Sequence, residues 1–600
     1  MSICDRICVK ITLILQFMRN LTAILYFILV FLLLPFPFIA ESQSFHIGGY
    51  KAVYDSVNGR WLCSVPRAYF GSDWSTTLEA DSTFSTLVVN GKKAINGEAV
   101  VFEDISGGKL YPVNAVVNGA PVTGAVTFTW LPVMELDGVF GNSYRMGTVS
   151  MNIPDEASEG AMIAKVKWRG NITNTSGKHK RNYSIKFVNE DGSKKDRRFF
   201  GLRKDNHWKL DAGQPDRLRI RNRVCTDLWL DMSRPVWYQE TEPEAINGAR
   251  GRMIEVILNG QYQGIYNMME PVDRKQLKLV KHDTINNEFH GQLWCCQEWC
   301  RTGTMSNPAE WSNSKAKWEG IEVEYPDFDD VSPTDWNTLA DAIMFTYTTE
   351  RAKRWNELAD SLDYYFDMPV MVDYLIFIVA LQALDNESKN IYYACHDKAE
   401  NPRLTLTPWD LDVSVGAQSF SYLTADVVNP ERPVNWLYHI PMTVVFGKSN
   451  RFHDDMNKRY WELRDTWLNT DSLINRFQRV IDELEQCGAS AREEARWSHD
   501  SDIGGARLDL SREMSYVADW ITKRMAYLDE NVFERPVEPK PLVGDINKDG
   551  EISVADINAL IEVVLGTAAD SDTIQLCDLN GDREITVSDI NQLINLIMQL

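Results

Sequence analysis

The sequence predicts a multidomain α+β protein, and three observations predict it. The first part of the chain is a succession of short β-rich runs separated by Gly and Asn turns. A long central region begins with strand patterns and becomes helical after about Ser332. The last part holds a duplicated acidic loop, and each copy opens an apolar helix. Strand-rich and helix-rich stretches that follow one another are typical of α+β folds.

The length and charge of the chain limit its class. It has 600 residues, too many for one hydrophobic core, so several domains are expected. With 44% hydrophobic and 24% charged residues, its composition is that of a globular protein. The formal net charge of -22 argues against a nucleic-acid partner, because phosphate binding needs a basic surface. Divalent cations are the expected partners of such a chain.

Residues 1–42 are predicted to be a secretory signal peptide. From Met18 the chain has a basic start at Arg19, an apolar run over residues 21–34, and the small residues Ala40 and Ser42 before the cleavage point. An uncleaved anchor is the alternative, since the apolar stretch could nearly span a bilayer. We therefore expect a secreted or cell-surface protein that has no membrane contact after cleavage.

Residues 43–136 are expected to form a small β-sandwich in which no residue has an evident chemical role. Residues 137–535 are expected to form one larger domain. Its strands are predicted in "AMIAKVKWRG", "RNYSIKF" and "MIEVILNGQYQGIYNMMEPV", and a helix in "RVCTDLWLDMSRPVWY". The segment "SREMSYVADWITKRMAYL" has apolar residues at steps of three and four, which indicates an amphipathic helix that closes the domain.

The cysteines do not have the spacing of a zinc site, so no thiolate metal centre is predicted. Cys295, Cys296 and Cys300 lie close together in the sequence. They are expected either to form a local disulfide after export or to pack as buried thiols.

A proline-rich linker, residues 536–542, precedes a tail with an internal repeat, residues 543–600. The repeat pairs "DINKDGEISVADINALIEVVLG" with "DLNGDREITVSDINQLINLIMQL". Alternate oxygen ligands around one point are what Ca²⁺ requires, and close carboxylates would repel one another without a cation. The sequence therefore predicts two EF-hand-like calcium loops, whose ligands at positions 1, 3, 5, 7 (through the carbonyl), 9 and 12 are Asp545, Asn547, Asp549, Glu551, Ser553 and Asp556, and Asp578, Asn580, Asp582, Glu584, Thr586 and Asp589.

This loop-helix unit, duplicated without an entering helix, resembles a type I dockerin. The resemblance implies a small all-α, calcium-binding domain that binds a cohesin-like scaffold protein. Arg583 departs from it at position 6, where Gly550 stands in the first loop. Because this position turns with φ above zero, Arg583 is expected to strain the second loop and weaken its affinity for calcium. The partner-recognition positions also depart, since most lack the hydroxyls of other dockerins: Val554, Ala555, Val587 and Ser588.

A polar segment follows a strongly apolar one in "VMVDYLIFIVALQALDNESKN". The apolar run is too short for a membrane span and is predicted to be a buried helix. The next segment, "NIYYACHDKAENPRLTLTPWDLD", reads as a β-hairpin that returns Asp410 to the side of Asp385 and Asn390. This is the arrangement of a phosphotransferase: Asp385 would accept the substrate hydroxyl, and Asn390 and Asp410 would hold Mg²⁺ against the nucleotide phosphates. A solvated helix end is the alternative, because this spacing also arises by chance.

A phosphate-binding lysine is expected on a strand upstream. In "KHKRNYSIKF", Lys180, Asn182, Ser184 and Lys186 share one face of the predicted strand. Lys186 is the first choice for the cation that pairs with the α and β phosphates, and Lys180 is the alternative. The preceding "RGNITNTSG" could cover the nucleotide, although it lacks GxGxxG spacing.

Together these segments resemble the CotH kinase family of atypical protein kinases. The matching pieces span about residues 165–416, and by extension the helical region to about 535: "KWRGN", "KRNYSIKF", "FGLRKDNHWKLDA" with "RNRV", "VILNGQYQGIYNMMEPVD", "LQALDNESKN" and "TPWDLDVSVG". The resemblance implies a kinase-like two-lobed fold, ATP with Mg²⁺ or Mn²⁺, and phosphorylation of Ser or Thr in exported protein substrates. It also implies that "MMEPVD" passes the adenine as a hinge with Glu270 nearby, and that Asp412 is a second metal-ligand candidate beside Asp410.

The functional prediction is an exported, metal-dependent protein kinase that is tethered through its dockerin-like tail. The alternative is a non-catalytic pseudokinase of a cell-surface or cellulosome-like assembly linked to polysaccharide degradation, since a fold does not settle a function. A carbohydrate-active enzyme is a third reading, which only the resemblance to a dockerin suggests. A glycosidase needs a pair of carboxylates, which Asp385 and Asp410 could imitate. That reading leaves Asn390 and the lysines without a purpose.

Overall fold

The structure is a computed structural model that describes residues 44–93, 98–156, 159–170, 174, 179–286, 288–310, 317–326, 335–417, 428–498, 507–536 and 542–599. The chain divides into two compact units, one ending at Phe533 and one beginning at Glu534. The predicted signal peptide lies outside the described residues, as do most of the linker 536–542 and most of "RGNITNTSG". No helix in the described part of the chain is long and apolar enough to cross a membrane.

The first unit opens with nine strands in the order β6-β5-β8-β9-β3-β2-β1-β4-β7. Alternating buried and exposed positions, as in β8, place one face of this sheet on its own core. Phe102 on the last strand in that order touches Phe128 on β9 with ring centroids 5.1 Å apart, so the sheet curves over a shared core. The strands are β1 Phe45–Ile47, β2 Tyr50–Asp55, β3 Arg60–Ser64, β4 Trp74–Ala80, β5 Phe84–Val89, β6 Lys92–Lys93, β7 Ala99–Phe102, β8 Tyr111–Val117 and β9 Ala120–Thr129.

A closed barrel follows, in the order β10-β11-β12-β13-β14-β16-β15. Its interior is filled by a separate apolar cluster that includes Ile185, Trp208 and Met268. The first strand of the barrel crosses the expected domain boundary at residue 136, so the barrel begins before that boundary. The strands are β10 Val133–Asp137, β11 Arg145–Asn152, β12 Glu159–Arg169, β13 Asn182–Phe187, β14 His207–Asp211, β15 Gly251–Leu258 and β16 Gln261–Met269.

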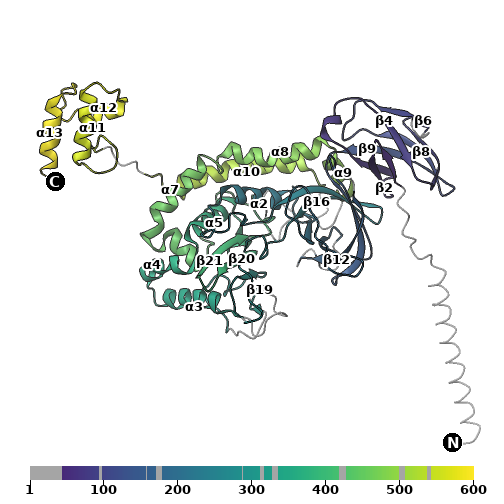
Figure 1. The fold of residues 1–600 in the computed structure, drawn as a ribbon, viewed down its shortest axis with the longest axis horizontal. Helices are drawn as coiled ribbons and strands as arrows, with labels where there is room; N and C mark the ends of the chain where they lie inside the picture. The colour runs from purple at the N-terminus through teal and green to yellow at the C-terminus, as the bar shows by residue number, and fades with distance from the viewer. Residues whose placement is uncertain are drawn as a thin grey trace, which may run out of the picture. The chain divides into compact units, whose positions relative to one another are not determined.

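The rest of the first unit packs helices around a five-stranded antiparallel sheet in the order β18-β19-β17-β20-β21. The strands are β17 Gln292–Cys296, β18 Lys317–Trp318, β19 Ile321–Tyr325, β20 Ile391–Asp397 and β21 Asn401–Pro408. The helices are α2 Arg221–Met232, α3 Asn337–Arg351, α4 Trp355–Tyr365, α5 Met368–Leu381, α6 Ile440–Thr443, α7 His453–Arg464, α8 Thr470–Gln486, α9 Ala489–Trp497 and α10 Leu510–Asn531. Figure 1 shows α8 and α10 side by side along this unit, and they pack on each other.

Several sequence predictions for this helical part are confirmed. The apolar run forms the buried helix α5, in which every residue except Pro369 is buried. The predicted hairpin is β20 and β21, and the predicted closing helix is α10. Cys295, Cys296 and Cys300 are buried free thiols, so the structure has the packing alternative and not the local disulfide.

The second unit is a small helical domain built on α11 Val554–Val564, α12 Ser571–Cys577 and α13 Val587–Ile597. Helices α11 and α13 pack on each other around Leu560 and Leu593. Each of these two helices begins at a capping box, formed by Ser553 with Asp556 and by Thr586 with Asp589. The duplicated sequence thus folds into two equivalent loop-helix units, as predicted.

Candidate functional site

A cleft of about 860 Å³ gathers most of the predicted site residues from segments that are far apart in the sequence. Barrel strands β12, β13 and β14 supply one set of lining side chains. The segments after α5 and after β21 supply another. Of the residues predicted for this site, Lys186, Asp385, Asn390, Asp410 and Asp412 line the cleft.

The end of helix α5 and the end of the hairpin are fastened together by one amide side chain. The helix ends at Gln382 in the left-handed conformation, and a 3-10 turn, Leu384–Glu387, carries Asp385. Asn386 donates to the carbonyl oxygens of Asn390 and Trp409, at 3.2 and 2.8 Å. These bonds hold Asp385 and Asp410 at the same cleft.

The backbone is strained at two of the predicted ligands. Asn390 and Asp410 have φ of 57° and 55°, a region that side chains with a Cβ rarely adopt. Residues held there cost of order 1 to 3 kcal/mol and cluster at functional sites. The strain is consistent with side chains that are aimed at a ligand.

Three carboxylates influence one another in the cleft. Burial raises the pKa of Asp410, and the neighbouring Asp211 raises it further. Burial also raises the pKa of Asp412 well above its usual range, with added contributions from Asp410 and Asp211. Asp211 is itself held by the side chain of Asn222 at 2.6 Å.

This set of donors fits a metal ion. In the described part of the chain, no hydrogen-bond donor reaches the carboxylates of Asp410 or Asp412, whereas Lys389 pairs with Asp385 at 2.9 Å. Crowded, half-buried carboxylates without donors are stabilised by a divalent cation, and oxygen atoms are the ligands that Mg²⁺ and Mn²⁺ prefer.

Opposite charge comes from the barrel. Lys167, Arg169, Lys186 and Lys209 all line the cleft. Burial lowers the pKa of Lys209 to about 7, and the cations of Arg169, Lys167 and Lys186 contribute to this shift. An anion bound here would relieve the repulsion. The cleft thus joins a cationic wall, suited to phosphates, to a group of carboxylates suited to a metal.

Two predicted site residues are not in the cleft. Lys180 is fully buried and ion-paired with Glu493 on α9, with Nζ and Oε1 2.8 Å apart. It therefore does not present its ammonium to the phosphate site. The carboxylate of Glu270 is buried against Arg250, with Nη2 and Oε1 2.8 Å apart, so it does not face a nucleotide. The residues directly after it, Pro271 to Asp273, do line the cleft.

Sequence reasoning missed Lys209, Asp211, Lys167 and Arg169. The signal was present, because "HWKLD" alternates polar with apolar residues and so places His207, Lys209 and Asp211 on one face. The register sets Ser184 opposite both Lys167 and Lys209, so the strands β12, β13 and β14 present these side chains together. The same alternation that pointed to Lys186 would have pointed to them.

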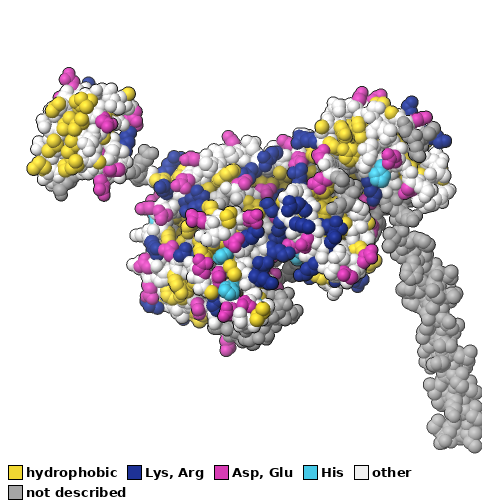
Figure 2. All heavy atoms as spheres, viewed as in Figure 1, with side chains coloured by type: hydrophobic (Ala, Val, Ile, Leu, Met, Phe, Trp, Pro, Cys, Tyr) yellow, Lys and Arg dark blue, Asp and Glu magenta, His cyan; other side chains and the backbone are white. Residues whose placement is uncertain are grey.

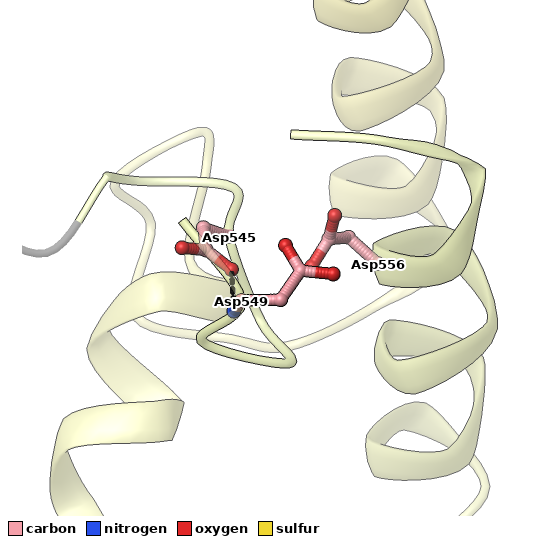
Figure 3. A group of neighbouring side chains, drawn as sticks. All are labelled: Asp545, Asp549 and Asp556. Carbon is pink, nitrogen blue, oxygen red and sulfur yellow. Dashed lines mark hydrogen bonds between the residues drawn. The ribbon is translucent and has the colours of Figure 1, made fainter. Parts of the chain in front are cut away.

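The tail holds a second site. Asp545, Asp549 and Asp556 bring carboxylate oxygens within 4.8 Å of one another (Figure 3), and no other group of three acids, histidines or cysteines in the described residues does so. Asp556 is fully buried and accepts from the backbone of Ile546 and Ser553 at 2.8 Å. The second loop repeats the pattern, with Asp589 accepting from Leu579 and Thr586. These carboxylates fit Ca²⁺.

The two calcium loops carry equal numbers of strained positions. Arg583 has φ of 66°, as expected at position 6, where Gly550 has φ of 90° in the first loop. At position 4 the roles are exchanged, because Lys548 has φ of 60° and Gly581 has φ of 74°. Each loop therefore has one non-glycine residue in the left-handed region. The expected weakness of the second loop does not follow from backbone strain.

Comparisons with known proteins agree with this geometry. The family model described as CotH kinase protein matches residues 166–528, which is more than half of the chain. The model described as Dockerin type I domain matches residues 543–598. No curated protein is significantly similar to the chain.

Proposed function

Because the chain belongs to the CotH kinase family and ends in a type I dockerin domain, we propose that it is an ATP- and metal-dependent protein kinase held on a scaffold. Its substrates would be Ser or Thr residues of proteins outside the cytoplasm, and its place would be the cell surface or the secreted fraction. The observation that carries this proposal is the cleft in which barrel lysines and an arginine lie with three mutually interacting aspartates.

In this proposal, different side chains of the cleft have different roles in phosphoryl transfer. Bound ATP with Mg²⁺ or Mn²⁺ supplies the phosphoryl group. Asp410, with Asn390 and Asp412 as further candidates, would hold the metal. Lys186 and its neighbour Lys209 would hold the phosphates. Asp385 would orient the acceptor hydroxyl and take its proton, and Lys389 keeps that carboxylate in place.

The dockerin domain implies binding to a cohesin module. The side chains at the partner-recognition positions Val554 and Val587 are exposed at the starts of α11 and α13, at 64% and 61%. These two positions are equivalent in the two repeats. An apolar contact is therefore expected where other dockerins offer hydroxyls.

The test is transfer of labelled γ-phosphate from ATP by the full chain, with Mg²⁺ or Mn²⁺, to itself or to a serine-rich peptide. We expect transfer by the natural sequence and a loss of about a hundredfold or more in Asp385→Asn, because a positioned base contributes about 10² to 10⁴ in rate. Binding of ATP without any transfer, in the presence of each metal, would refute the kinase proposal. A non-catalytic role would then be the better account.

A further inference from the structure

The cationic wall of the cleft surrounds one aromatic side chain. Tyr144 lies at the end of the loop between β10 and β11, and it lines the cleft together with Lys167 of β12 and Lys186 of β13. Nζ of Lys167 lies over the Tyr144 ring, 4.8 Å from its centre, and Nζ of Lys186 lies over the same ring at 4.9 Å. One tyrosine ring thus contacts two lysines that face the proposed phosphate site.

The register of the barrel brings these two lysines to one ring. Lys167 is paired with Ser184 across β12 and β13, and Lys186 follows Ser184 by two positions on β13. Directly paired side chains, and side chains two positions apart on a strand, point to the same face of a sheet. Both ammonium groups are therefore directed to the face of the barrel on which Tyr144 lies.

The hydroxyl of Tyr144 fixes the orientation of the ring. It lies 2.9 Å from Oγ of Ser184, and that Oγ lies 2.8 Å from Nε2 of His207 on β14. Burial, followed by the charges of Lys209 and Lys186, lowers the pKa of His207 far below its usual range, so the imidazole is neutral. The three side chains therefore form a series of hydrogen bonds that adds no charge to the wall.

The loop that carries Tyr144 is itself held at two points. The side chain of Asn259, in the β15–β16 turn, accepts from the N–H of Gly138 at 2.8 Å and donates to the carbonyl of Gly138 at 3.0 Å. The carbonyl of Gly141 accepts from the backbone N–H of Trp168 on β12 at 2.8 Å. These contacts make the loop a fixed part of the barrel, so little conformational entropy is lost there when a ligand binds.

The wall brings like charges together, and an aromatic ring reduces the cost. Lys167, Arg169, Lys186 and Lys209 all line the cleft. Figure 2 shows Lys and Arg side chains gathered over the barrel part of the molecule on the face in view. Neighbouring ammonium groups repel one another, and flexible lysine side chains can move apart into water. The face of a tyrosine ring carries negative charge density, so it attracts an ammonium and holds it in place.

We propose that Tyr144 is a positioning residue whose ring holds Lys167 and Lys186 at the cleft, so that both ammonium groups meet a chain of phosphates. The inference rests on the proposed function for the identity of the nucleotide. The positioning itself requires only that the wall bind a polyphosphate. Lys167 thereby joins Lys186 as a phosphate-binding residue, and the ring of Tyr144, not its hydroxyl, carries the effect.

The experiment is calorimetric titration of the full chain with inorganic tripolyphosphate in buffer freed of metal ions. This probe has the phosphate chain of ATP without the base, so its binding reports on the wall alone. We expect the natural sequence to bind it and Tyr144→Leu to bind about tenfold more weakly, because two ring contacts are lost. Tyr144→Phe keeps the ring and should bind within about twofold of the natural sequence.

Three results would overturn the proposal. They are absent binding by the natural sequence, unchanged affinity in Tyr144→Leu, and a loss in Tyr144→Phe equal to that in Tyr144→Leu. Transfer of phosphate from ATP is measured separately. A chain that binds tripolyphosphate through Tyr144 and transfers no phosphate would refute the kinase proposal and support this one.

A double-mutant cycle shows whether the ring acts through the lysines. In a Lys167→Met background, the loss caused by Tyr144→Leu should fall from about tenfold to about threefold, because one of the two contacts is already absent. An undiminished loss in that background would mean that the ring does not act through Lys167, which contradicts the proposal. Thermal unfolding of each variant confirms that it is folded.

Met146→Ala is the matched control for disturbance of this segment. Met146 lies two residues beyond Tyr144, is 51% exposed, and is not part of the cleft lining in the described part of the chain. Its substitution should leave the affinity for tripolyphosphate unchanged. A loss equal to that of Tyr144→Leu would show that any change near the start of β11 weakens binding, and would overturn the assignment to the ring.

Discussion

Asp385 and Asp410 face the same cleft in different electrostatic states. Asp385 is paired with Lys389, whereas the carboxylate of Asp410 accepts no hydrogen bond from the described residues and has its pKa raised by burial and by Asp211. We expect Asp410→Asn to lose metal-dependent ATP binding by at least about tenfold, because it removes a metal ligand. Asp385→Asn should keep that binding and lose turnover. Calorimetry with ATP and Mg²⁺ tests the pair, and an equal loss of binding in both would contradict these separate roles.

Lys186 lies on β13 and Lys180 just before it, and the two side chains have different surroundings. Lys186 lines the cleft, whereas Lys180 is buried in the ion pair with Glu493. Lys186→Met should weaken ATP binding without changing the melting temperature. Lys180→Met should destabilise the fold by about 3 kcal/mol, because breaking a buried pair leaves a charge poorly compensated, although Arg219 still bonds to Glu493. If Lys180→Met instead left stability intact and abolished ATP binding, the assignment of the two lysines would be reversed.

The calcium loops permit a comparison of single residues at strained positions. Arg583 and Lys548 each have φ near 60°, where a side chain costs about 1 to 2 kcal/mol relative to Gly. We therefore expect Arg583→Gly and Lys548→Gly to strengthen calcium binding by similar factors, each in its own loop. Calcium titration of residues 542–600, followed through the amide signals of both loops, measures this. A gain confined to Arg583→Gly would show that position 6 is the more strained one.

At the scale of elements, helix α9 packs closely on the hairpin β15–β16 because residue 264 is a glycine. Gly264 has φ of 92°, and a Cβ there would lie 1.9 Å from Oε2 of Glu493, which also accepts from the backbone N–H of Ile265 at 2.8 Å. Gly260 in the same hairpin has φ of 68° but no atom within 4 Å of its Cβ position. We expect Gly264→Ala to destabilise the first unit by several kcal/mol, and Gly260→Ala by only the backbone cost of about 1 to 2 kcal/mol. Equal melting temperatures would show that α9 is not held by this contact.

The elements also show what a sequence can reveal. Helix α5, the β20–β21 hairpin and α10 could be predicted, because each has a long periodic pattern or a local turn. The ion pair between Lys180 and Glu493 could not be predicted, because the two residues are more than 300 positions apart in the sequence. Only the folded structure brings these buried side chains together. Lys180 and Lys186 share a face by alternation, yet Lys180 precedes the first residue of β13 and turns inward. Alternation predicts a face only where the strand continues.

At the scale of the first unit, the N-terminal sheet is fixed to the barrel and to the helices behind it. Lys51 pairs with Glu135 at 2.5 Å, and Ser56 donates to the carbonyl of Gly260 at 2.8 Å. A small apolar cluster crosses the same boundary: Val53, Leu62, Val133, Ile257 and Tyr262. The barrel that supplies the cationic wall of the cleft is therefore supported from outside by this sheet.

One glycine tests that support. Gly107 is in the loop between β7 and β8 and contacts the short connection between α8 and α9. A Cβ at Gly107 would lie 2.0 Å from the carbonyl carbon of Cys487 in that connection. The carbonyl of Gly107 accepts from Arg492 at 3.0 Å, and Arg492 pairs with the buried Glu255 of β15 at 2.8 Å. We expect Gly107→Ala to push the sheet off this contact and to cost about 2 kcal/mol, the usual scale of overpacking. Gly108→Ala is the control, because nothing lies within 4 Å of its Cβ position. Calorimetric unfolding should show a lower or split transition for Gly107→Ala alone; a single, unshifted transition would mean that the sheet does not stabilise the barrel.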